Sequence, residues 1–414
     1  MRWPEHRPER RVGAVARSQR FPQPRAVIAL RVRDRAVRTL VGGLLAALAC
    51  GCAPRPVTVV LAVLPSELAA VRAVFDAYAA ESGQRVHVVA QQYPEIRRAL
   101  AAEAVGGGGA LDLVELDVYS LALSAEDVRP LEDAALGPTL DALEPAALRA
   151  GEFHGLRFLP YRLSWQALLY DATVLEEPPA TWEELLAVAR AHSGRIGLKG
   201  ARYEGLTCDV LPFVWAAGAS GTEFDDPRVR SAFELFQALA PHLHPHAATF
   251  KEATIAEAMA RGELVLHLNW PFAMRLYASQ GLAPERIRSA PLPAGPAGRA
   301  TVLGGGYLGI PRHAPHRDAA LRLLAYLLSQ PVQARLGREL GWFSARRDVP
   351  VAPESGPLLA GYAASRSVAR PRPERRDYPR LSRLWQEAFR AVAFEHVGPA
   401  AALAEASRRW RGGD

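Results

Sequence analysis

The chain has 414 residues, 49% of them hydrophobic, and a formal net charge of +7. Residues 1–40 hold eleven arginines and only three acidic residues, which accounts for more than the whole net charge. The basic balance therefore does not indicate nucleic-acid binding by the rest of the chain, and we expect no nucleic-acid partner. The residues after position 52, about 360 of them, are too many for one hydrophobic core and indicate two lobes.

A short apolar segment, Leu40–Cys52, follows several arginines and ends in two cysteines, each preceded by a small residue. A bilayer-spanning helix needs ~20 apolar residues, so the segment is too short to be one. The basic flank and the prolines that follow argue against the alternative of a buried core helix. The pattern is typical of a bacterial secretion signal with a lipid-modified cysteine. We expect Cys52 to carry the lipid, because Gly51 fits the small site before it, with Cys50 as the alternative.

This leader predicts where the protein works. Residues 1–39 are expected to be a basic, disordered extension or no part of the mature chain, and residues 40–52 to be the signal with its lipid-attachment site. We expect the mature protein in the periplasm or at the extracytoplasmic face of the membrane, held there by its lipid anchor.

Strand and helix patterns alternate after the leader. Strands are predicted at Val57–Val63, Val86–Ala90 and Leu111–Leu116, and helices at Leu68–Ser82 and Ile96–Val105. Gly106–Gly109 follows the second helix and predicts a helix end and turn. A β-α-β-α-β series of this kind predicts an α/β fold with a parallel sheet that helices cover on both faces.

Strand and helix patterns continue to alternate over the rest of the chain. Thr181 and Glu184 predict a capping box at the start of the helix Trp182–Ala191. Residues 353–380 are rich in Pro, Arg and Ser and predict a connecting segment. The other expected elements are strands at Leu163–Tyr170, Leu264–Leu268 and Tyr307–Ile310, and helices at Val229–Ala240, Ile255–Arg261, Ala319–Ser329, Val332–Glu339 and Leu381–Trp410.

Few residue patterns point to catalysis or metal binding. His242, His244 and His246 form the one histidine cluster, which is either a metal-binding tract or, as we favour, a solvated loop. Cys208 is the one cysteine after the leader, and we expect a buried core residue rather than a catalytic thiol. No zinc-ligand spacing or phosphate-binding loop is visible, so we predict neither a metal site nor a cofactor.

Polar and aromatic residues at strand ends are better candidates for binding. Asp117 and Tyr119 follow a predicted strand, and ligands of open α/β sheets lie outside the carboxyl ends of strands. Trp270 and Phe272 follow another strand, where aromatic faces could stack on a sugar ring. The alternatives are a helix cap for Asp117 and core packing for the aromatic rings. Gly304–Gly306 suits a lobe hinge, a close approach to ligand, or a simple turn.

Five segments together resemble a known family: Phe153–Tyr170, Pro178–Leu185, Gly200–Cys208, Gly262–Phe272 and Gly304–Ile310. They resemble the family 1 extracellular solute-binding proteins of ABC importers, and the last three resemble its maltose/trehalose branch. The likeness covers nearly all of residues 57–410. It implies a two-lobe periplasmic-binding-protein fold of type II, similar to maltose-binding protein, with a ligand cleft between the lobes. On this pattern one lobe comprises residues 57–162 and 300–345, and the other residues 163–299 and 346–414.

The resemblance also implies a binding site. Asp117 matches the family's acid after the third strand, Phe272 its aromatic beside Trp270, and Trp385 a stacking tryptophan, while Trp342 is a weaker match. Tyr307 stands where sugar binders usually carry Trp. The full set of predicted ligand-binding residues is Asp117, Tyr119, Tyr161, Arg162, Ser164, Trp165, Tyr203, Trp270, Phe272, Gly305, Tyr307, Trp342 and Trp385.

The chain departs from the family pattern at two acids, because Ser164 and Pro212 stand where sugar binders usually carry carboxylates. Charge-assisted hydrogen bonds from such acids are about twice as strong as neutral ones, so the identity of the ligand is open. Arg162 and Arg202 lie near these motifs and leave an anionic glycan as an alternative to solvated arginines.

The resemblance implies that the protein captures a small carbohydrate and delivers it to the transmembrane subunits of an ABC permease, without being an enzyme. We expect a monomer. One alternative is a ligand-sensing lipoprotein that signals to a membrane receptor. A periplasmic glycosidase using Glu115 and Asp117 is a weaker alternative, because neighbours on one strand end cannot easily flank a scissile bond.

Overall fold

Two β-sheets organise the residues that the computed structural model describes, which are 55–131, 136–283, 285–350 and 357–413. One sheet has six strands, in the order β10-β9-β3-β1-β2 with β4 paired to β9, and the other has four, in the order β6-β7-β5-β8. The predicted signal and both candidate lipid-attachment cysteines, Cys50 and Cys52, lie outside the described residues. Within the described part of the chain, no helix is long and apolar enough to cross a membrane.

The first elements confirm the predicted β-α-β-α-β series. They are β1 (Val57–Leu61), α2 (Leu68–Ser82), β2 (Val86–Ala90), α3 (Tyr93–Gly106) and β3 (Leu113–Asp117). Strand β1 pairs in parallel with both β2 and β3.

Helix α3 begins three residues before the predicted start, because Gln92 and Glu95 form a capping box and Pro94 suits the first turn. It ends at Gly106 and is capped by Gly107, whose φ of 65° is left-handed, as the glycine run predicts.

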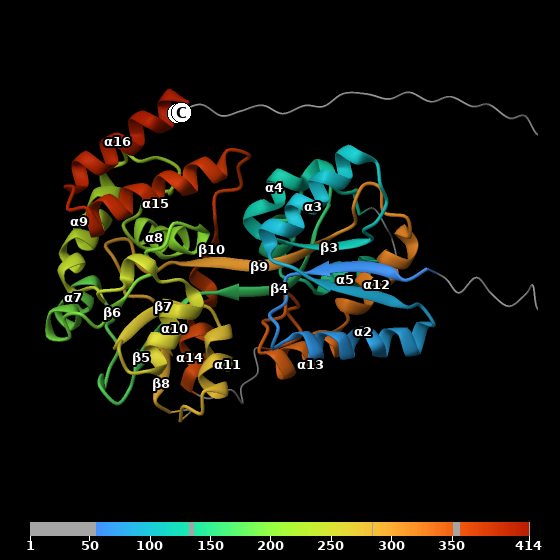
Figure 1. Cartoon of the computed structure of the whole chain (residues 1–414), viewed down its shortest axis with the longest axis horizontal. Helices are drawn as coiled ribbons and strands as arrows, with labels where there is room; N and C mark the ends of the chain where they lie inside the picture. Colours follow the sequence, from blue (N-terminus) through green and yellow to red (C-terminus); the bar gives the residue numbers. More distant parts are fainter. Residues whose placement is uncertain (1–54, 132–135, 284, 351–356, 414) are drawn as a thin grey trace, which may run out of the picture. The chain divides into compact units, whose positions relative to one another are not determined.

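Strands β4 (Leu159–Trp165) and β9 (Thr301–Gly309) complete the six-stranded sheet. Strand β9 is antiparallel to β3 and β4, while β10 (Ala369–Pro371) is parallel to it (Figure 1). The predicted single strand Leu163–Tyr170 is wrong. It is the end of β4 followed by β5 (Ala167–Asp171), and these two strands belong to different sheets. Periodicity continues through this region because both strands are buried, so it does not reveal the passage between sheets.

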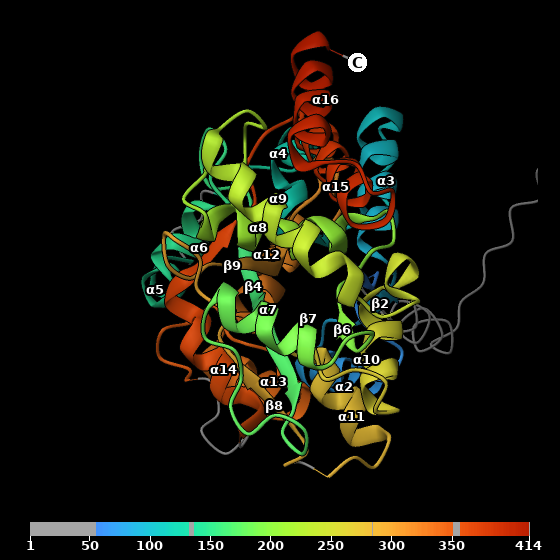
Figure 2. The same cartoon turned by 90° about the vertical axis from the view of Figure 1, so that its left-hand side faces the viewer.

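The second sheet contains β5, β6 (Ile196–Gly197), β7 (Leu266–Asn269) and β8 (Ile287–Ala290). Strand β5 is antiparallel to β7 and β8, whereas β6 is parallel to β7. Both sheets are therefore mixed, and the predicted parallel arrangement holds for β1, β2 and β3 but not for either whole sheet. The helices after β5 are α7 (Trp182–Ala191), α8 (Glu204–Ala216), α9 (Pro227–Leu239), α10 (Glu252–Ala260), α11 (Phe272–Ser279), α14 (Pro357–Ser365), α15 (Tyr378–Phe394) and α16 (Pro399–Gly412). Helix α14 lies along β8 (Figure 2).

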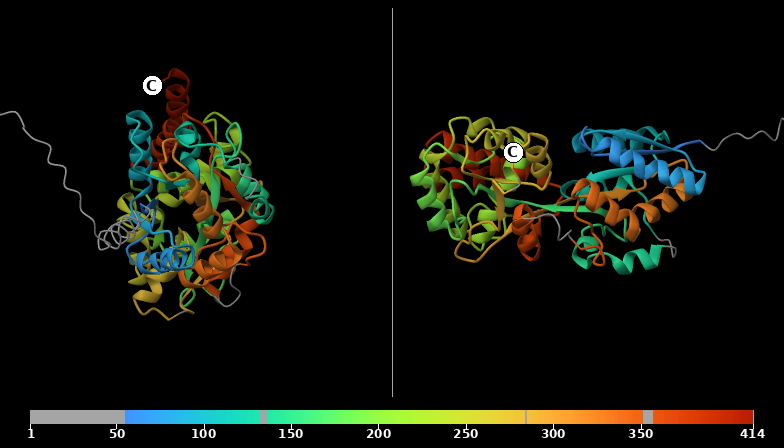
Figure 3. Two further views of the ribbon diagram at one scale, coloured as in Figure 1. Left: turned by 90° about the vertical axis from the view of Figure 1, so that its right-hand side faces the viewer. Right: turned by 90° about the horizontal axis from the view of Figure 1, so that it is seen from below.

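Other helices accompany the six-stranded sheet. They are the short helices α4 (Leu121–Ser124), α5 (Gly137–Ala142) and α6 (Pro145–Arg149), followed later in the chain by α12 (Arg317–Leu327) and α13 (Gln330–Leu340). Helix α13 packs beside α2, although the two are far apart in the sequence (Figure 3). We call the six-stranded sheet with these helices, α2 and α3 the first lobe, and the four-stranded sheet with α7–α11 and α14–α16 the second lobe.

Helix boundaries follow the local signals. Thr181 caps α7 by accepting a hydrogen bond from the Glu184 amide at 3.3 Å, which confirms the predicted cap. The Glu184 carboxylate accepts from the Ala180 amide instead of from that of Thr181. The predicted helical stretch Leu381–Trp410 is divided between α15 and α16, which begins at Pro399. Helix α8 was not predicted, because its residues after Glu204 are all buried and leave no polar face to reveal a helical period.

The core of the second lobe includes a histidine that is fully buried. His267 on β7 shares a hydrogen bond of 2.7 Å with the Tyr277 hydroxyl. Burial, together with the charge of the nearby Lys199, lowers the pKa of His267 to about 3. Lys199 is itself buried and paired with Asp209 at 2.5 Å. The second lobe therefore holds an uncharged imidazole beside a compensated ion pair.

The pKa of His267 predicts how stability changes with pH. An unfolded histidine has a pKa of about 6.5, so the unfolded chain binds more protons than the folded chain between roughly pH 3 and 6.5. The free energy of unfolding should rise with pH over that window, and this residue contributes up to about 1.4 kcal/mol per pH unit. Above about pH 6.5 the residue adds no further stability. Urea unfolding of the wild type and His267→Gln at pH 4.5, 5.5, 6.5 and 7.5 measures the slope. Equal slopes for the two proteins would contradict the assignment.

Candidate functional site

A cavity of about 690 Å³ lies between residues of the two lobes, and we call it the interlobe cavity. Gly304–Gly306 of β9 are among its walls, with the ends of β3 and β10 nearby. Its side-chain lining comes mainly from Glu67, Tyr93, Asp117, Tyr119, Arg162, Ser164, Tyr203, Glu204, Lys251, Glu252, Trp270, Phe272, Trp342 and Arg372.

The glycine run lies inside a strand and not in a turn, so the turn interpretation is wrong. A Cβ at Gly304 would lie 2.8 Å from the Trp270 ring, and one at Gly306 would lie 1.7 Å from the Glu115 carboxylate. Side chains from both lobes therefore approach this strand more closely than any other residue type would permit.

Arg162 is anchored on the first-lobe side of the cavity. Its Nε donates to Glu115 Oε1 at 2.8 Å, and Glu115 also accepts from the Tyr93 hydroxyl at 2.8 Å and from the Ala62 amide at 3.0 Å. The guanidinium carbon lies 4.1 Å from the centroid of the Trp342 ring. Arg162 is thus neutralised by a fully buried carboxylate. Arg202, the other candidate for an anionic ligand, is 64% exposed and lies 3.9 Å from Glu395, outside the cavity.

Trp342 is held in place by a second carboxylate. Its indole Nε1 donates to Glu67 Oε1 at 2.9 Å, while Glu67 Oε2 accepts from the Leu64 amide. The Tyr161 ring packs edge-on against Trp342, with centroids 5.7 Å apart. These contacts orient one aromatic face of the first lobe.

Tyr203 and Glu252 form the opposite wall. The Tyr203 hydroxyl donates to Glu252 Oε2 at 2.6 Å, and burial together with this carboxylate raises the pKa of Tyr203 well above its usual value. A Cβ at Gly205 would lie 2.3 Å from the Tyr203 hydroxyl, so only glycine leaves room for this pair. Lys251 lies 5.6 Å from the Tyr203 ring centroid and adds a cation at the same wall.

Arg372 joins the two walls through ion pairs. Its guanidinium binds Asp117 at 2.5 Å and Glu204 at 2.9 Å, and its carbon lies 4.9 Å from the Tyr119 ring centroid. Burial raises the pKa of Glu204, and this shift is opposed by Arg372 and by hydrogen bonds from Tyr378 and Ser382. Asp117 also accepts from the Tyr119 amide at 3.2 Å, so it is a helix cap as well as a lining residue of the cavity.

Nine of the thirteen predicted site residues line the cavity: Asp117, Tyr119, Arg162, Ser164, Tyr203, Trp270, Phe272, Gly305 and Trp342. The other four, Tyr161, Trp165, Tyr307 and Trp385, are at most 1% exposed and belong to the core. Pro212 is likewise buried inside α8, so the acid expected at that position would not face the cavity.

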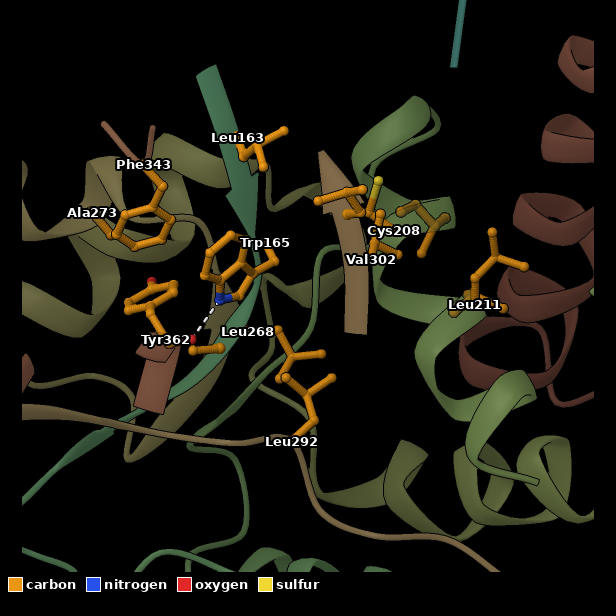
Figure 4. Packing of buried hydrophobic residues seen from close by; sticks show 14 of the residues in the cluster. Leu163, Trp165, Cys208, Leu211, Leu268, Ala273, Leu292, Val302, Phe343 and Tyr362 are labelled. Atoms are coloured by element: carbon orange, nitrogen blue, oxygen red, sulfur yellow. Dashed lines mark hydrogen bonds between the residues drawn. The ribbon is translucent and has the colours of Figure 1, made fainter. Parts of the chain in front are cut away.

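Strand alternation explains three of these corrections. Tyr161 and Trp165 alternate along β4 with Arg162 and Ser164, which are partly exposed. Trp165 packs on Phe343 and donates to the Tyr362 carbonyl at 2.6 Å (Figure 4). Tyr307 follows the cavity residue Gly306 on β9, and its hydroxyl donates to the Ala147 carbonyl at 3.0 Å.

Trp385 is misplaced for a different reason. It lies on the buried face of α15, where its ring centroid is 4.2 Å from that of Phe224 and its Nε1 donates to the Gly221 carbonyl at 3.0 Å. Trp385 matched the family pattern only as a tryptophan in the C-terminal helices. In the structure, α15 directs its side chain into the core of the second lobe.

Several cavity residues were not predicted. Glu67, Tyr93 and Glu252 lie at or near the starts of helices. An acidic residue, or a residue beside proline, at such a position indicates a helix cap and not a binding role. Arg372 lies in the segment predicted only as a connection. Cys208 is free and 1% exposed, which confirms the expectation of a buried residue, although it borders the cavity. Burial raises the pKa of its thiol well above the usual value, so the reactive thiolate is disfavoured.

The profile of the bacterial extracellular solute-binding proteins matches residues 73–359. The chain belongs to this family. This match confirms the family predicted from the motifs. It also indicates that the protein acts outside the cytoplasm. Family and fold are those of binding proteins and not of enzymes.

Individual relatives of this solute-binding protein agree with the assignment. A probable ABC transporter-binding protein of Deinococcus radiodurans is 27% identical over 290 residues, which cover 63% of this chain and 69% of that protein. The norspermidine sensor of Vibrio cholerae is 29% identical over 133 residues, 32% of this chain and 34% of the sensor. The solved structure of maltose-bound MalE3 of T. maritima has a TM-score of 0.78 at 24% identity and covers 86% of this chain and 99% of that one. The predicted two-lobe, maltose-binding-protein-like fold is confirmed.

The Arg162–Glu115 pair in this solute-binding protein generates a stability prediction. Arg162→Met leaves the Glu115 carboxylate, which is fully buried, without its cation and should lower the free energy of unfolding by about 3–5 kcal/mol. Adding Glu115→Gln should recover part of that loss. Urea unfolding measures both variants.

Arg202→Met is the matched control, because this exposed pair should contribute less than about 1 kcal/mol. If Arg162→Met is no more destabilising than Arg202→Met, the buried pair does not have the role assigned to it.

Proposed function

We propose that this solute-binding protein captures a small carbohydrate in the interlobe cavity and delivers it to the permease of an ABC importer. The observation that carries the proposal is a cavity that combines aromatic rings with carboxylates from both lobes. Trp270, Phe272 and Trp342 offer faces for the apolar side of a sugar ring, and Asp117 and Glu252 offer acceptors for hydroxyl groups. The fold shared with maltose-bound MalE3 and the partial match to an ABC transporter-binding protein support it.

The mechanism follows from the position of the cavity. A ligand that contacts both lobes stabilises the arrangement in which they are closed around it, and so shifts an open–closed equilibrium by its differential affinity. The permease then recognises the closed form, and no bond in the ligand changes. We propose lobe boundaries at residues 57–162 with 300–345 and 163–299 with 346–414. On these boundaries the end of β4 and the whole of β10, which belong to the six-stranded sheet, fall with the second lobe. The protein acts as a monomer, tethered through Cys52 or Cys50.

Neutral sugars fit the charges of the cavity better than anionic glycans do. Arg162 is held by Glu115, and Arg372 is held by two carboxylates. Lys251 is the remaining cation among the lining residues, and it stands next to Glu252. An anionic ligand would therefore meet two arginines that are already compensated.

A sensor function is a second candidate, because part of the chain matches the norspermidine sensor. A sensor would bind its solute in the same cavity and signal to a membrane receptor instead of a permease. Amine solutes therefore belong in the same binding screen as sugars.

The proposed function predicts that sugars raise the melting temperature of the protein. Thermal unfolding with maltose, maltotriose, trehalose and norspermidine tests both candidates. Stabilisation by a sugar supports import of a carbohydrate. Stabilisation by norspermidine alone would refute the carbohydrate assignment.

Trp270→Ala should weaken binding of the stabilising sugar at least about tenfold, or about 1.4 kcal/mol, because the variant removes an aromatic face beside Gly304. Isothermal titration calorimetry measures the dissociation constant. Trp410→Ala is the control, since Trp410 packs on Phe224 in the second lobe and lies outside the cavity lining. An equal loss in both variants would rule out a specific contact by Trp270.

A further inference from the structure

Arg372 occupies a place in the cavity that an external ligand could fill. It follows directly after β10, whose last residue, Pro371, pairs with Leu303 of β9. Strand β3 ends at Asp117, which pairs with Gly306 of the same strand. Because β4 occupies the other edge of β9, β10 and β3 share one edge and leave Gly304 and Gly305 between them. Arg372 reaches across this gap to Asp117.

The guanidinium makes the contacts expected of a bound guest. Its nitrogens donate to one carboxylate from each lobe, Asp117 and Glu204, and its flat face lies near the Tyr119 ring. Donors directed at carboxylates and a face over an aromatic ring are also how a polyhydroxylated ring is held. The Arg372 side chain is only 2% exposed, and its buried Nε has no hydrogen-bond partner among the described residues.

We propose that Arg372 is an internal occupant of one ligand subsite, formed by Asp117, Tyr119 and Glu204, and that it thereby limits which ligands the interlobe cavity accepts. The subsite takes a donor-rich group with a face that can lie on the Tyr119 ring, such as a guanidinium or a sugar ring. This inference rests on the proposed binding function of the cavity. Removing one partner of a buried ion pair is strongly unfavourable, so a small ligand does not displace Arg372 and binds in the remaining part of the cavity.

The first test needs no knowledge of the natural ligand. Arg372→Ala vacates the subsite, and methylguanidinium at millimolar concentration should then raise the melting temperature of the variant by about 2 °C relative to tetramethylammonium at equal concentration. The wild type should show no such difference. Arg375→Ala is the matched control, because Arg375 pairs with Asp377 outside the cavity lining.

If Arg372→Ala does not fold, Arg372→Gln takes its place, since an amide can hold one carboxylate while leaving the other free. No methylguanidinium-specific stabilisation of the folded variant would overturn the proposal.

The second test asks whether the occupant limits ligand size. Calorimetry should give similar dissociation constants for maltose and maltotriose with the wild type, and about tenfold tighter binding of maltotriose than of maltose with Arg372→Ala. Weaker binding of both sugars by the variant would overturn the proposal and make Arg372 a ligand contact. If neither sugar binds either protein, the carbohydrate function fails for these sugars, while the methylguanidinium titration still decides the role of Arg372.

Discussion

Strand β9 is the constraint on which both lobes and the cavity depend. It pairs with β4 along one edge and with β3 and β10 along the other, so three separate parts of the chain meet on one strand. Its three consecutive glycines let Trp270 and Glu115 lie against the backbone. A side chain there would push these groups away, and with Glu115 the position of Arg162. The shape of the cavity thus depends on glycine, which has no side chain, at these positions.

Charge compensation is the second organising feature. Each arginine at the cavity has a defined carboxylate partner, and each partnership involves a buried or nearly buried group. Arg162 belongs to one lobe together with Glu115, whereas Arg372 connects acids of different lobes. The Arg162–Glu115 pair therefore stabilises the wall of one lobe, whereas the ion pairs of Arg372 link the two lobes.

Much of the first lobe could be predicted from the sequence, because its strands and helices alternate in clear periods and are closed by ordinary caps. Helix α7 was predicted to the residue for the same reason. The passage from β4 to β5 could not be predicted, since both strands are buried and their pattern runs on without a break. Helix α8 lacked a polar face, and so it left no helical period in the sequence.

The residues of the candidate site could likewise be predicted only in part. Residues directly after strands, such as Asp117, Trp270 and Phe272, were predicted because strand ends meet at the edge of a sheet. Residue type alone misled for Trp165 and Trp385, since it does not say which side of a strand or helix faces the core. Arg372 left no signal at all. Its importance comes from acids that lie far from it in the sequence and are brought to it only by the fold.

Helix α15 has a consequence for how the protein is made. Trp385 fits among Phe224 and Phe233, which are synthesised much earlier, and α15 packs against α8 and α9. Until the ribosome has released this late segment, those aromatic rings lack their contacts with Trp385, and the second lobe cannot finish its core. Assembly that waits for such distant contacts is slow. That delay suits a polypeptide that must pass through a membrane before it acquires its final form.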